Sequence, residues 1–579
     1  MVSASCRHRT LVVVVALGVL SCVGSVSAQS EFRGFWVDAF HPGFKTTSQI
    51  NDMVNRAVTG NYNAIVAEVL AYQDNAGSGH GAYWKSSIVP WASEVAWNFD
   101  PLAYLCQQAH AQGIEVHAWL VAYRVSTSWP PSGNSTIASH PEWIMVPRGN
   151  MGTGPAPILG KYTLDPGSPE VQEYIISIVQ ELVGGYPIDG INWDYIRYTQ
   201  TDAGYPADLT YTKSSLARFQ DITGYVGTPP SEGEALWDDF RRRTINELVR
   251  RARAEVAAIA SNPRQPVCHS ADLLATGNAP YSFSSSLAYI YFQNWRHWME
   301  MGWLDAGMPM NYKREHCTGG AQGDQATWYR NWIDAIVNDW RYDRHMYCGQ
   351  ADYLNSMANS VIQLQYVYAA GADGSMNYSY YATRAAETVC DDSDSWVNDW
   401  SWYSYVAANI FTSPASLPSM PWRDPAVAVE GTLWGQVTDH STGLPVDDAT
   451  VQVGTLAPVQ TDGNGYYVVT LVPATQTGTA YDVQVTKAGY PDWMVSGVLV
   501  VAGDIRRRDV DLGAPPPPGD MDHDGDVDYD DLMYFVFCLQ GPGVTYLPGH
   551  LCLDGDADED TDVDLVDFAS FQDVFTGPS

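Results

Sequence analysis

Eight short apolar runs recur through the first two thirds of the chain, and stretches with apolar residues at helical spacing separate them. Strands that alternate with amphipathic helices indicate a parallel sheet, because each parallel connection must cross back over the sheet. Eight such units within about 380 residues predict an α/β fold, a (β/α)8 TIM barrel with enlarged loops. A doubly wound sheet needs fewer strands and usually carries a glycine-rich phosphate loop, which we do not find. The expected strands are residues 32–40, 63–72, 114–124, 187–194, 266–274, 303–313, 345–354 and 373–381.

Acidic residues at the ends of these strands are the first candidates for chemistry, because barrel enzymes place their reactive groups there. Asp194 closes the strand within YPIDGINWDYIRY (186–198) and shares a face with Asn192, since side chains alternate along a strand. The alternative is that Asp194 only caps the next loop. Three further acids fall at or near strand ends and are expected around the same cleft: Asp38, Glu68 and Asp272.

Other polar residues are sorted by the same positional rule. Asp189 and Asp305 begin their strands, so we expect them to bond backbone groups at the opposite end of the barrel. His117 and Trp119 share the inward face of the third strand and, with Asp38 and Asn192, are expected to contact substrate. For His117, a core histidine is at least as plausible. Four residues are expected to line the mouth and contact substrate: Asn311, Tyr312, Asn377 and Tyr378.

Composition narrows the function classes. The chain contains 21 Trp and 35 Tyr, and aromatic rings stack on sugar faces, although core packing uses them too. The net charge of −35 argues against nucleic acid, whose binding needs clustered Lys and Arg. Beyond the N-terminal segment, no apolar run is long enough to span a bilayer.

The first 28 residues have the features of a bacterial secretory signal peptide. Arg7 and Arg9 precede an apolar core, and Val26-Ser27-Ala28 forms a small-residue cleavage site. Lipoprotein cleavage before Cys22 is the alternative, and we favour the first. The protein is therefore expected to be secreted or associated with the cell surface.

Seven cysteines remain after cleavage, so at least one thiol is free or paired with another chain. Export permits disulfides, and the proximity of Cys538 and Cys552 makes them the expected pair. None has the CxxC spacing of a zinc site.

Several blocks of the barrel region resemble a known family. GFWVDAF, NAIVAEVL, IEVHAWLVAYR, LDPGSPEVQEYI…DGINWDYIRY and DAGMPMNYK are similar, in this order across residues 31–400, to the glycosyl hydrolase-like 10 family. The resemblance implies a barrel similar to those of α-amylases, and some bacterial members cleave the glycan strands of peptidoglycan. It places Asp194 on the strand-four acid that sugar-cleaving barrels share. The chain has Asn192 where the family commonly has His, and Tyr195 where a second acid is frequent.

Glycoside cleavage requires a carboxylic acid that protonates the leaving oxygen and a carboxylate that acts as nucleophile or base. Asp194 is expected to be one of the two. Glu68 is the first candidate for its partner, because a glutamate beside apolar groups can have the raised pKa of a general acid; Asp272 is the second. We therefore expect a glycoside hydrolase acting on a polysaccharide or cell-wall glycan, without a catalytic cofactor. A non-catalytic glycan-binding barrel is the alternative, and a metal hydrolase lacks a clear His/Asp cluster.

Residues 431–513 alternate apolar and polar positions between Gly, Asn and Asp turns, which predicts a small β-sandwich. The patterns GxVTD…GxPVxxAxVxV and TDxNGxY resemble the carboxypeptidase regulatory-like domain, with a spacer or carbohydrate-contacting role. Residues 415–430 and 514–518 are proline-punctuated and indicate linkers.

The C-terminal segment 519–579 holds sixteen Asp or Glu and no Lys or Arg. Its acids recur at the spacing of calcium loops, which need many oxygen ligands. With the apolar helical pattern after each loop, the segment resembles a type I dockerin, a small α-helical calcium-binding domain whose implied partner is a cohesin module. A solvated acidic tail is the alternative. The expected ligands are Asp520, Asp522, Asp524, Asp528 and Asp531 in the first loop and Asp556, Asp558, Asp560, Asp564 and Asp567 in the second.

These expectations divide the chain into six parts. They are a signal peptide (1–28), a glycosyl hydrolase-like barrel (29–414), a linker (415–430), a β-sandwich (431–513), a proline linker (514–518) and a dockerin-like domain with two calcium loops (519–579).

Calcium is expected to order residues 519–579, because without a cation the clustered carboxylates repel one another. Chymotrypsin, followed by reduction and mass spectrometry, should cleave this segment of the full chain rapidly in EGTA and slowly in calcium. The same cleavage rate in both conditions would contradict the calcium assignment.

Overall fold

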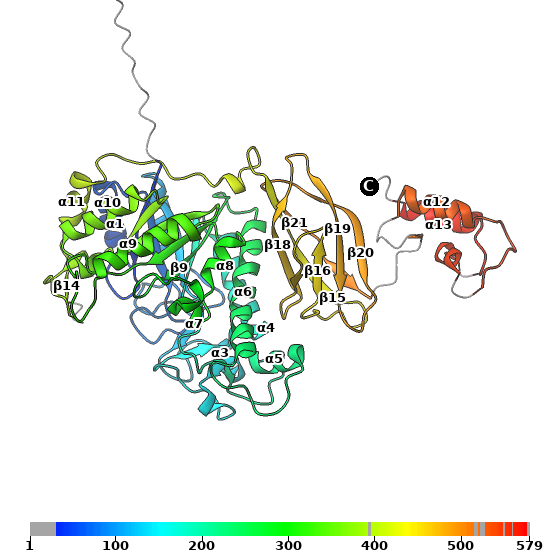
Figure 1. Cartoon of the computed structure of the whole chain (residues 1–579), viewed down its shortest axis with the longest axis horizontal. Coiled ribbons are helices and arrows are strands. Elements are labelled where there is room, and N and C mark those ends of the chain that lie inside the picture. Colours follow the sequence, from blue (N-terminus) through cyan, green and yellow to red (C-terminus); the bar gives the residue numbers. More distant parts are fainter. Residues whose placement is uncertain are drawn as a thin grey trace, which may run out of the picture.

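The computed structural model describes residues 30–391, 395–513, 519–521, 527–547, 550–558 and 560–575. Three of the expected features lie outside these residues: the signal peptide (1–28), the proline linker (514–518) and the ligands Asp522 and Asp524. Figure 1 shows a barrel, a β-sandwich beside it and two short helices beyond the sandwich. None of the helices in the described ranges is long and apolar enough to cross a membrane.

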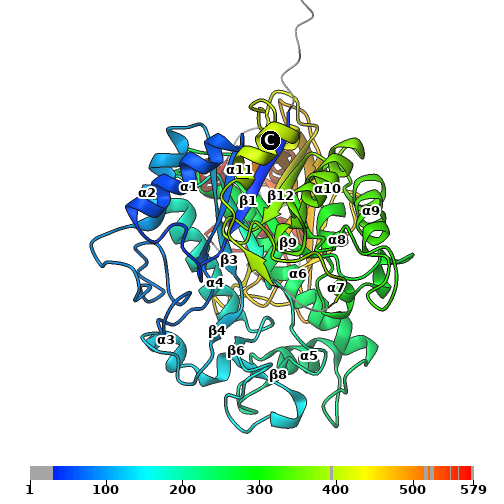
Figure 2. The same ribbon diagram turned by 90° about the vertical axis from the view of Figure 1, so that its left-hand side faces the viewer.

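The predicted eight-stranded parallel barrel is confirmed: the strands close in the order β1-β12-β11-β10-β9-β7-β3-β2. They are β1 (Phe32–Val37), β2 (Ala64–Leu70), β3 (Glu115–Val121), β7 (Gly190–Asp194), β9 (Cys268–Leu274), β10 (Ala306–Met310), β11 (His345–Ala351) and β12 (Gly374–Tyr378). Helices surround them (Figure 2). The main ones are α1 (Thr47–Thr59), α2 (Pro101–His110), α4 (Pro169–Gly185), α6 (Ala235–Ala258), α8 (Trp295–Glu300), α9 (Gln325–Ala335), α10 (Met357–Ala369) and α11 (Trp402–Asn409).

Local sequence explains where several helices begin. The side chains of Thr46, Ser168 and Ser356 each accept a hydrogen bond from a backbone N–H of the first turn of α1, α4 and α10. The inward face of the strands is filled by large apolar side chains that include Trp36, Trp119 and Met308. The barrel interior is therefore a packed core, and chemistry is confined to its rim.

The loops that follow β3 and β7 form an additional sheet beside the barrel, which the sequence analysis did not predict. Its antiparallel strands are β4 (Arg124–Ser126), β6 (Tyr162–Leu164), β5 (Ile144–Val146) and β8 (Tyr205–Pro206), in that order. Helix α5 (Ser215–Thr223) lies next to it (Figure 2). The inserted sheet extends one side of the rim near Asp194.

The opposite end of the barrel is closed by aspartates, as predicted. Asp189 accepts hydrogen bonds from the Val116 backbone N–H at 2.8 Å and from Arg264 Nε. Asp305 accepts from the His269 backbone N–H at 3.0 Å, and although burial raises its pKa, Arg253 and Arg423 hold the value well below the ordinary one. Both acids are structural.

The expected linker 415–430 packs against this closed end. Its 3-10 turn Pro421–Arg423 places Trp422 Nε1 2.7 Å from Asp305 Oδ1 and Arg423 Nη1 3.3 Å from Asp305 Oδ2. The chain therefore enters the next part from a defined position on the barrel.

Two four-stranded sheets form the sandwich, around a core of Val, Leu and Tyr side chains. One contains β15 (Glu430–Asp439), β18 (Tyr466–Pro473), β21 (Ile505–Arg507) and β22 (Val510–Leu512). The other contains β16 (Thr450–Val453), β17 (Val459–Gln460), β19 (Thr479–Thr486) and β20 (Trp493–Val500).

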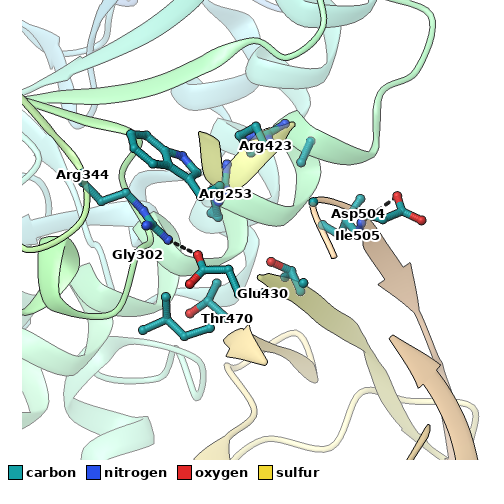
Figure 3. A pocket seen from close by; sticks show the side chains of 14 residues that line it. Arg253, Gly302, Arg344, Arg423, Glu430, Thr470, Asp504 and Ile505 are labelled. Atoms are coloured by element: carbon teal, nitrogen blue, oxygen red, sulfur yellow. Dashed lines mark hydrogen bonds and ion pairs between the residues drawn. The ribbon is translucent and has the colours of Figure 1, made fainter. Parts of the chain in front are cut away.

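Ion pairs join the sandwich to the barrel. Arg218 on α5 contacts Glu247 on α6 at 3.1 Å and Asp447 of the sandwich at 2.8 Å. Burial raises the pKa of Glu247, but Arg218 and Arg243 lower it to about 2. A second pair, Arg344 with Glu430 at 2.5 Å, borders a cavity of about 80 Å³ between the two parts (Figure 3). The interface holds buried charge, so the two parts form one unit.

The last part contains α12 (Tyr529–Cys538) and α13 (Leu565–Val574). The expected disulfide between Cys538 and Cys552 is confirmed. A second disulfide, Cys317–Cys390, joins the loops that follow β10 and β12 and was not predicted.

Removal of Arg218 should loosen this interface. Arg218→Met removes the buried cation that contacts both Glu247 and Asp447, while Arg243 still contacts Glu247 at 2.8 Å. Loss of one partner of a buried pair costs up to ~3 kcal/mol. Urea unfolding should show a loss of that order. The matched control, Lys213→Met, removes an exposed pair with Glu170 and should change stability little. Equal losses in the two variants would contradict the role given to Arg218.

Candidate active site

Three acids from strands far apart in the sequence meet at the rim of the barrel. Glu68 at the end of β2, Asp194 at the end of β7 and Asp272 on β9 are 4%, 7% and 2% exposed. Each carboxylate accepts a hydrogen bond: the Ala39 backbone N–H donates to Glu68 Oε2 at 2.9 Å, and the Tyr195 backbone N–H donates to Asp194 Oδ1 at 2.6 Å. Trp36 Nε1 donates to Asp272 Oδ1 at 3.1 Å.

The three acids differ in the groups that shift their pKa values. Burial raises the pKa of Glu68 to about 8, and the charges of Asp38 and Asp194 add to the effect. Burial and the charge of Asp194 raise the pKa of Asp272 well above its ordinary value. Burial also raises the pKa of Asp194, but there Arg197 and Arg124 oppose the rise. Asp194 is therefore the acid best supported as a carboxylate, while Glu68 keeps its proton near neutral pH.

Aromatic rings enclose these acids. The rings of Tyr312 and Tyr378 lie 5.5 Å apart, Trp119 meets Tyr378 edge-on at 6.5 Å, and Trp36 meets Tyr312 at 6.4 Å. Trp119, Tyr312 and Tyr378 thus lie where the sequence analysis expected substrate contacts. Such rings can stack on the apolar faces of a pyranose.

Asp38 has a different surrounding from the other acids. Its Oδ1 accepts hydrogen bonds from the backbone N–H groups of Phe40 and His41 at 2.8 and 3.0 Å, and His41 Nδ1 lies 2.9 Å away. These bonds cap the loop after β1. Asp38 therefore acts on the site mainly through its charge on Glu68.

Asn192 faces inward, as predicted, one layer below Asp194. Its Nδ2 donates to Ser270 Oγ at 3.2 Å, and its Oδ1 is buried without a hydrogen-bond partner among the described residues.

Three expected substrate contacts lie elsewhere. Asn377 donates to Asp352 and accepts from the Tyr62 hydroxyl, and Asn311 donates to the Tyr329 carbonyl, so both point behind the sheet. The reason is strand alternation: the adjacent residues Tyr378 and Tyr312 take the inward positions. His117 does face inward, but at the closed end, where it contacts Glu115 at 3.0 Å.

Two arginines beside Asp194, which contact the ring of Tyr195, were not predicted from the sequence. Tyr195 has a φ of +48°, and the guanidinium groups of Arg124 and Arg197 lie 3.6 and 4.3 Å from the centre of its ring. Both arginines follow strand ends, where charged side chains are common, so only their convergence distinguishes them from surface residues.

The second acidic loop brings carboxylates together. Oxygens of Asp556, Asp558 and Asp567 lie within 4.8 Å of one another, and so do those of Asp562, Asp564 and Asp567. Thr561, at the sharp turn of the loop, has a φ of +75°. This set of oxygens suits a hard cation such as calcium. Three of the expected ligands in the first loop, Asp520, Asp528 and Asp531, are described and are buried.

Comparisons with known proteins agree with this architecture. A family model described as glycosyl hydrolase-like 10 matches residues 31–368, and one described as carboxypeptidase regulatory-like domain matches residues 432–513. Glycosyl hydrolase DigH of Escherichia coli is 29% identical over 40% of this chain and 52% of its own length, so the chain spans about half of that relative. Glycosyl hydrolase YngK of Bacillus subtilis is 23% identical over 66% of this chain and 70% of its own.

Among solved structures, the endo-beta-1,4-mannanase of Thermotoga petrophila is similar at a TM-score of 0.39 and 12% identity, over 83% of this chain and 99% of that one. At this TM-score the likeness supports no conclusion about the chain.

The protonation of Glu68 can be tested through stability. Because its pKa is raised, its proton stabilises the fold fully below about pH 4.5, and this stabilisation is lost as pH rises through about 8. Glu68→Gln is neutral at every pH, so its unfolding free energy in urea should fall less than that of the wild type between about pH 5 and 8. The control Glu387→Gln, at an exposed glutamate, should follow the wild-type slope. A wild-type slope in Glu68→Gln would disprove the raised pKa.

Proposed function

The chain belongs to the glycosyl hydrolase-like 10 family, and from this premise we propose that it hydrolyses O-glycosidic bonds of a polysaccharide or cell-wall glycan. The observation that carries the proposal is the convergence of Glu68, Asp194 and Asp272 at the rim of the barrel, inside a wall of aromatic rings. The two relatives named glycosyl hydrolase support it.

Glu68 is the proposed general acid. Its raised pKa keeps a proton on the carboxyl near neutral pH, and that proton passes to the leaving glycosidic oxygen as the bond to the anomeric carbon breaks. Asp194 is the proposed carboxylate partner, since Arg197 and Arg124 favour its charged form. It attacks the anomeric carbon or removes a proton from the attacking water.

Asp272 is proposed as a binding residue. Burial and the charge of Asp194 favour its protonated form, which can donate a hydrogen bond to a sugar hydroxyl. Trp36 fixes its orientation from the other side.

A non-catalytic glycan-binding barrel is the second candidate. It is favoured by Asn192 and Tyr195, which replace the His and the second acid common in the family, and by the raised pKa of Asp194. In this case the same aromatic wall binds sugar without turnover.

We further propose that the protein is exported and tethered through its C-terminal segment. The N-terminal segment supports export. Large apolar side chains on α12 and α13 are exposed, among them Met533 and Phe537 at 75% and Leu565 at 73%. A calcium-ordered pair of helices with exposed apolar residues suits docking to a cohesin-type module.

A reducing-sugar screen of the full chain, across neutral and acidic polysaccharides and denuded peptidoglycan strands, tests the function. Asp194→Asn should lower turnover by about 10²- to 10⁴-fold with an unchanged circular dichroism spectrum. The control Asp208→Asn, at an exposed loop position, should keep wild-type turnover. Full turnover in Asp194→Asn would overturn the role of Asp194, and glycan binding without any turnover would favour the second candidate.

A further inference from the structure

A cavity of about 330 Å³ lies next to Asp194, between the barrel rim and the inserted sheet. Tyr195 and Arg197, which line it, follow Asp194 directly in the chain. Tyr123 and Arg124 line it from the end of β3, the strand that pairs with β7. Its volume falls in the range of about 300–1,000 Å³ that small-molecule sites span.

The cavity is strongly cationic. Arg124, Lys161 and Arg197 line it, and none of its described lining residues is acidic. None of the three cations forms an ion pair with a carboxylate in the part of the chain that the structure describes. Arg124 and Arg197 interact with the charge of Asp194 beside the cavity. Three cations against one carboxylate nevertheless leave an excess of positive charge, which is unusual in a chain with a net charge of −35 and favours an anionic ligand.

The cavity also contains polar atoms that lack hydrogen bonds. The Tyr123 hydroxyl, Arg124 Nε, Arg197 Nε and Thr199 Oγ1 are buried and have no hydrogen-bond partner among the described residues. Tyr123 is only 1% exposed. Because buried polar groups are normally satisfied, four such atoms around one cavity indicate a missing ligand with several acceptor atoms.

Lys161 reaches the cavity from a tight hairpin. Ile158 and Lys161 exchange backbone hydrogen bonds of 2.8 and 3.0 Å, and Leu159 and Gly160 between them have φ values of +48° and +74°. Positive φ at both central positions is the geometry of a type I′ turn. The lysine is therefore held at the cavity by a short and defined loop.

We propose that this pocket binds an anionic substituent of the glycan, a carboxylate or a sulfate, on a sugar adjacent to the bond that is cleaved. The proposal rests on the proposed function and deepens it, because it assigns the substrate to the acidic polysaccharides. Arginine and lysine donors match the oxygens of either anion, and the Tyr123 and Thr199 hydroxyls can complete the set.

The first experiment measures binding and does not depend on turnover. Calorimetry with Asp194→Asn should show tighter binding of a uronate or sulfated oligosaccharide than of a neutral one of equal length, and added salt should weaken it. The preferred anion distinguishes carboxylate from sulfate. Equal affinity for neutral and anionic oligosaccharides would overturn the proposal, whether or not the wild type hydrolyses any glycan.

The second experiment uses variants of Lys161. Lys161→Gln should weaken binding of the anionic oligosaccharide by about tenfold or more, and Lys161→Arg should restore it. The matched control Lys487→Gln removes the same charge from the sandwich, where Lys487 lies against Asp448, and should bind as the parent does. Unchanged affinity in Lys161→Gln would overturn the pocket assignment.

Turnover provides a separate readout. If the wild type hydrolyses an acidic glycan, the same glycan with its carboxyl groups reduced should be a poorer substrate. The ratio of kcat/KM for the acidic glycan to kcat/KM for the reduced glycan should then be closer to one in Lys161→Gln than in the wild type. A ratio that Lys161→Gln leaves unchanged would overturn the proposal while the hydrolase function stands.

Discussion

Closure of eight parallel strands into a barrel is the constraint on which the rest of the structure depends. Closure brings all carboxyl ends of the strands to one rim and turns every second side chain inward. Glu68, Asp194 and Asp272 are far apart in the chain, yet this geometry places them in mutual electrostatic contact. The same closure fills the interior with large side chains, so the site has a dry and rigid floor.

Buried acidic side chains have two roles in this fold. At the closed end, arginines surround Asp305 and keep it ionised, which joins the barrel to the segment that leads into the sandwich. At the rim, burial raises the pKa of Glu68 so that it keeps its proton, whereas the charges of Arg197 and Arg124 oppose the rise at Asp194. Burial therefore accompanies ionised, arginine-paired Asp305 at one end of the barrel and raises the pKa values of the rim acids at the other.

The inserted sheet connects the acids to the cationic pocket. Arg124 begins β4, and Lys161 directly precedes β6, so the strands that extend the rim also carry two of its cations. Tyr195 lies between the guanidinium groups of Arg124 and Arg197, immediately after Asp194. In the proposed function, recognition of an anionic substrate and the ionisation of Asp194 therefore depend on the same residues, Arg124 and Arg197.

The sequence by itself determined the features that follow from local pattern: the eight strands, the three rim acids, the structural aspartates and the Cys538–Cys552 pair. Strand spacing and chain proximity carry that information. Tertiary structure decided which of two adjacent residues faces inward, so that Tyr312 and Tyr378 line the site while Asn311 and Asn377 do not. Tertiary structure also placed His117 at the closed end of the barrel and brought Arg124, Lys161 and Arg197 around one cavity. Both outcomes depend on strand register and on loops that cross the rim, which are set by contacts between residues far apart in the sequence.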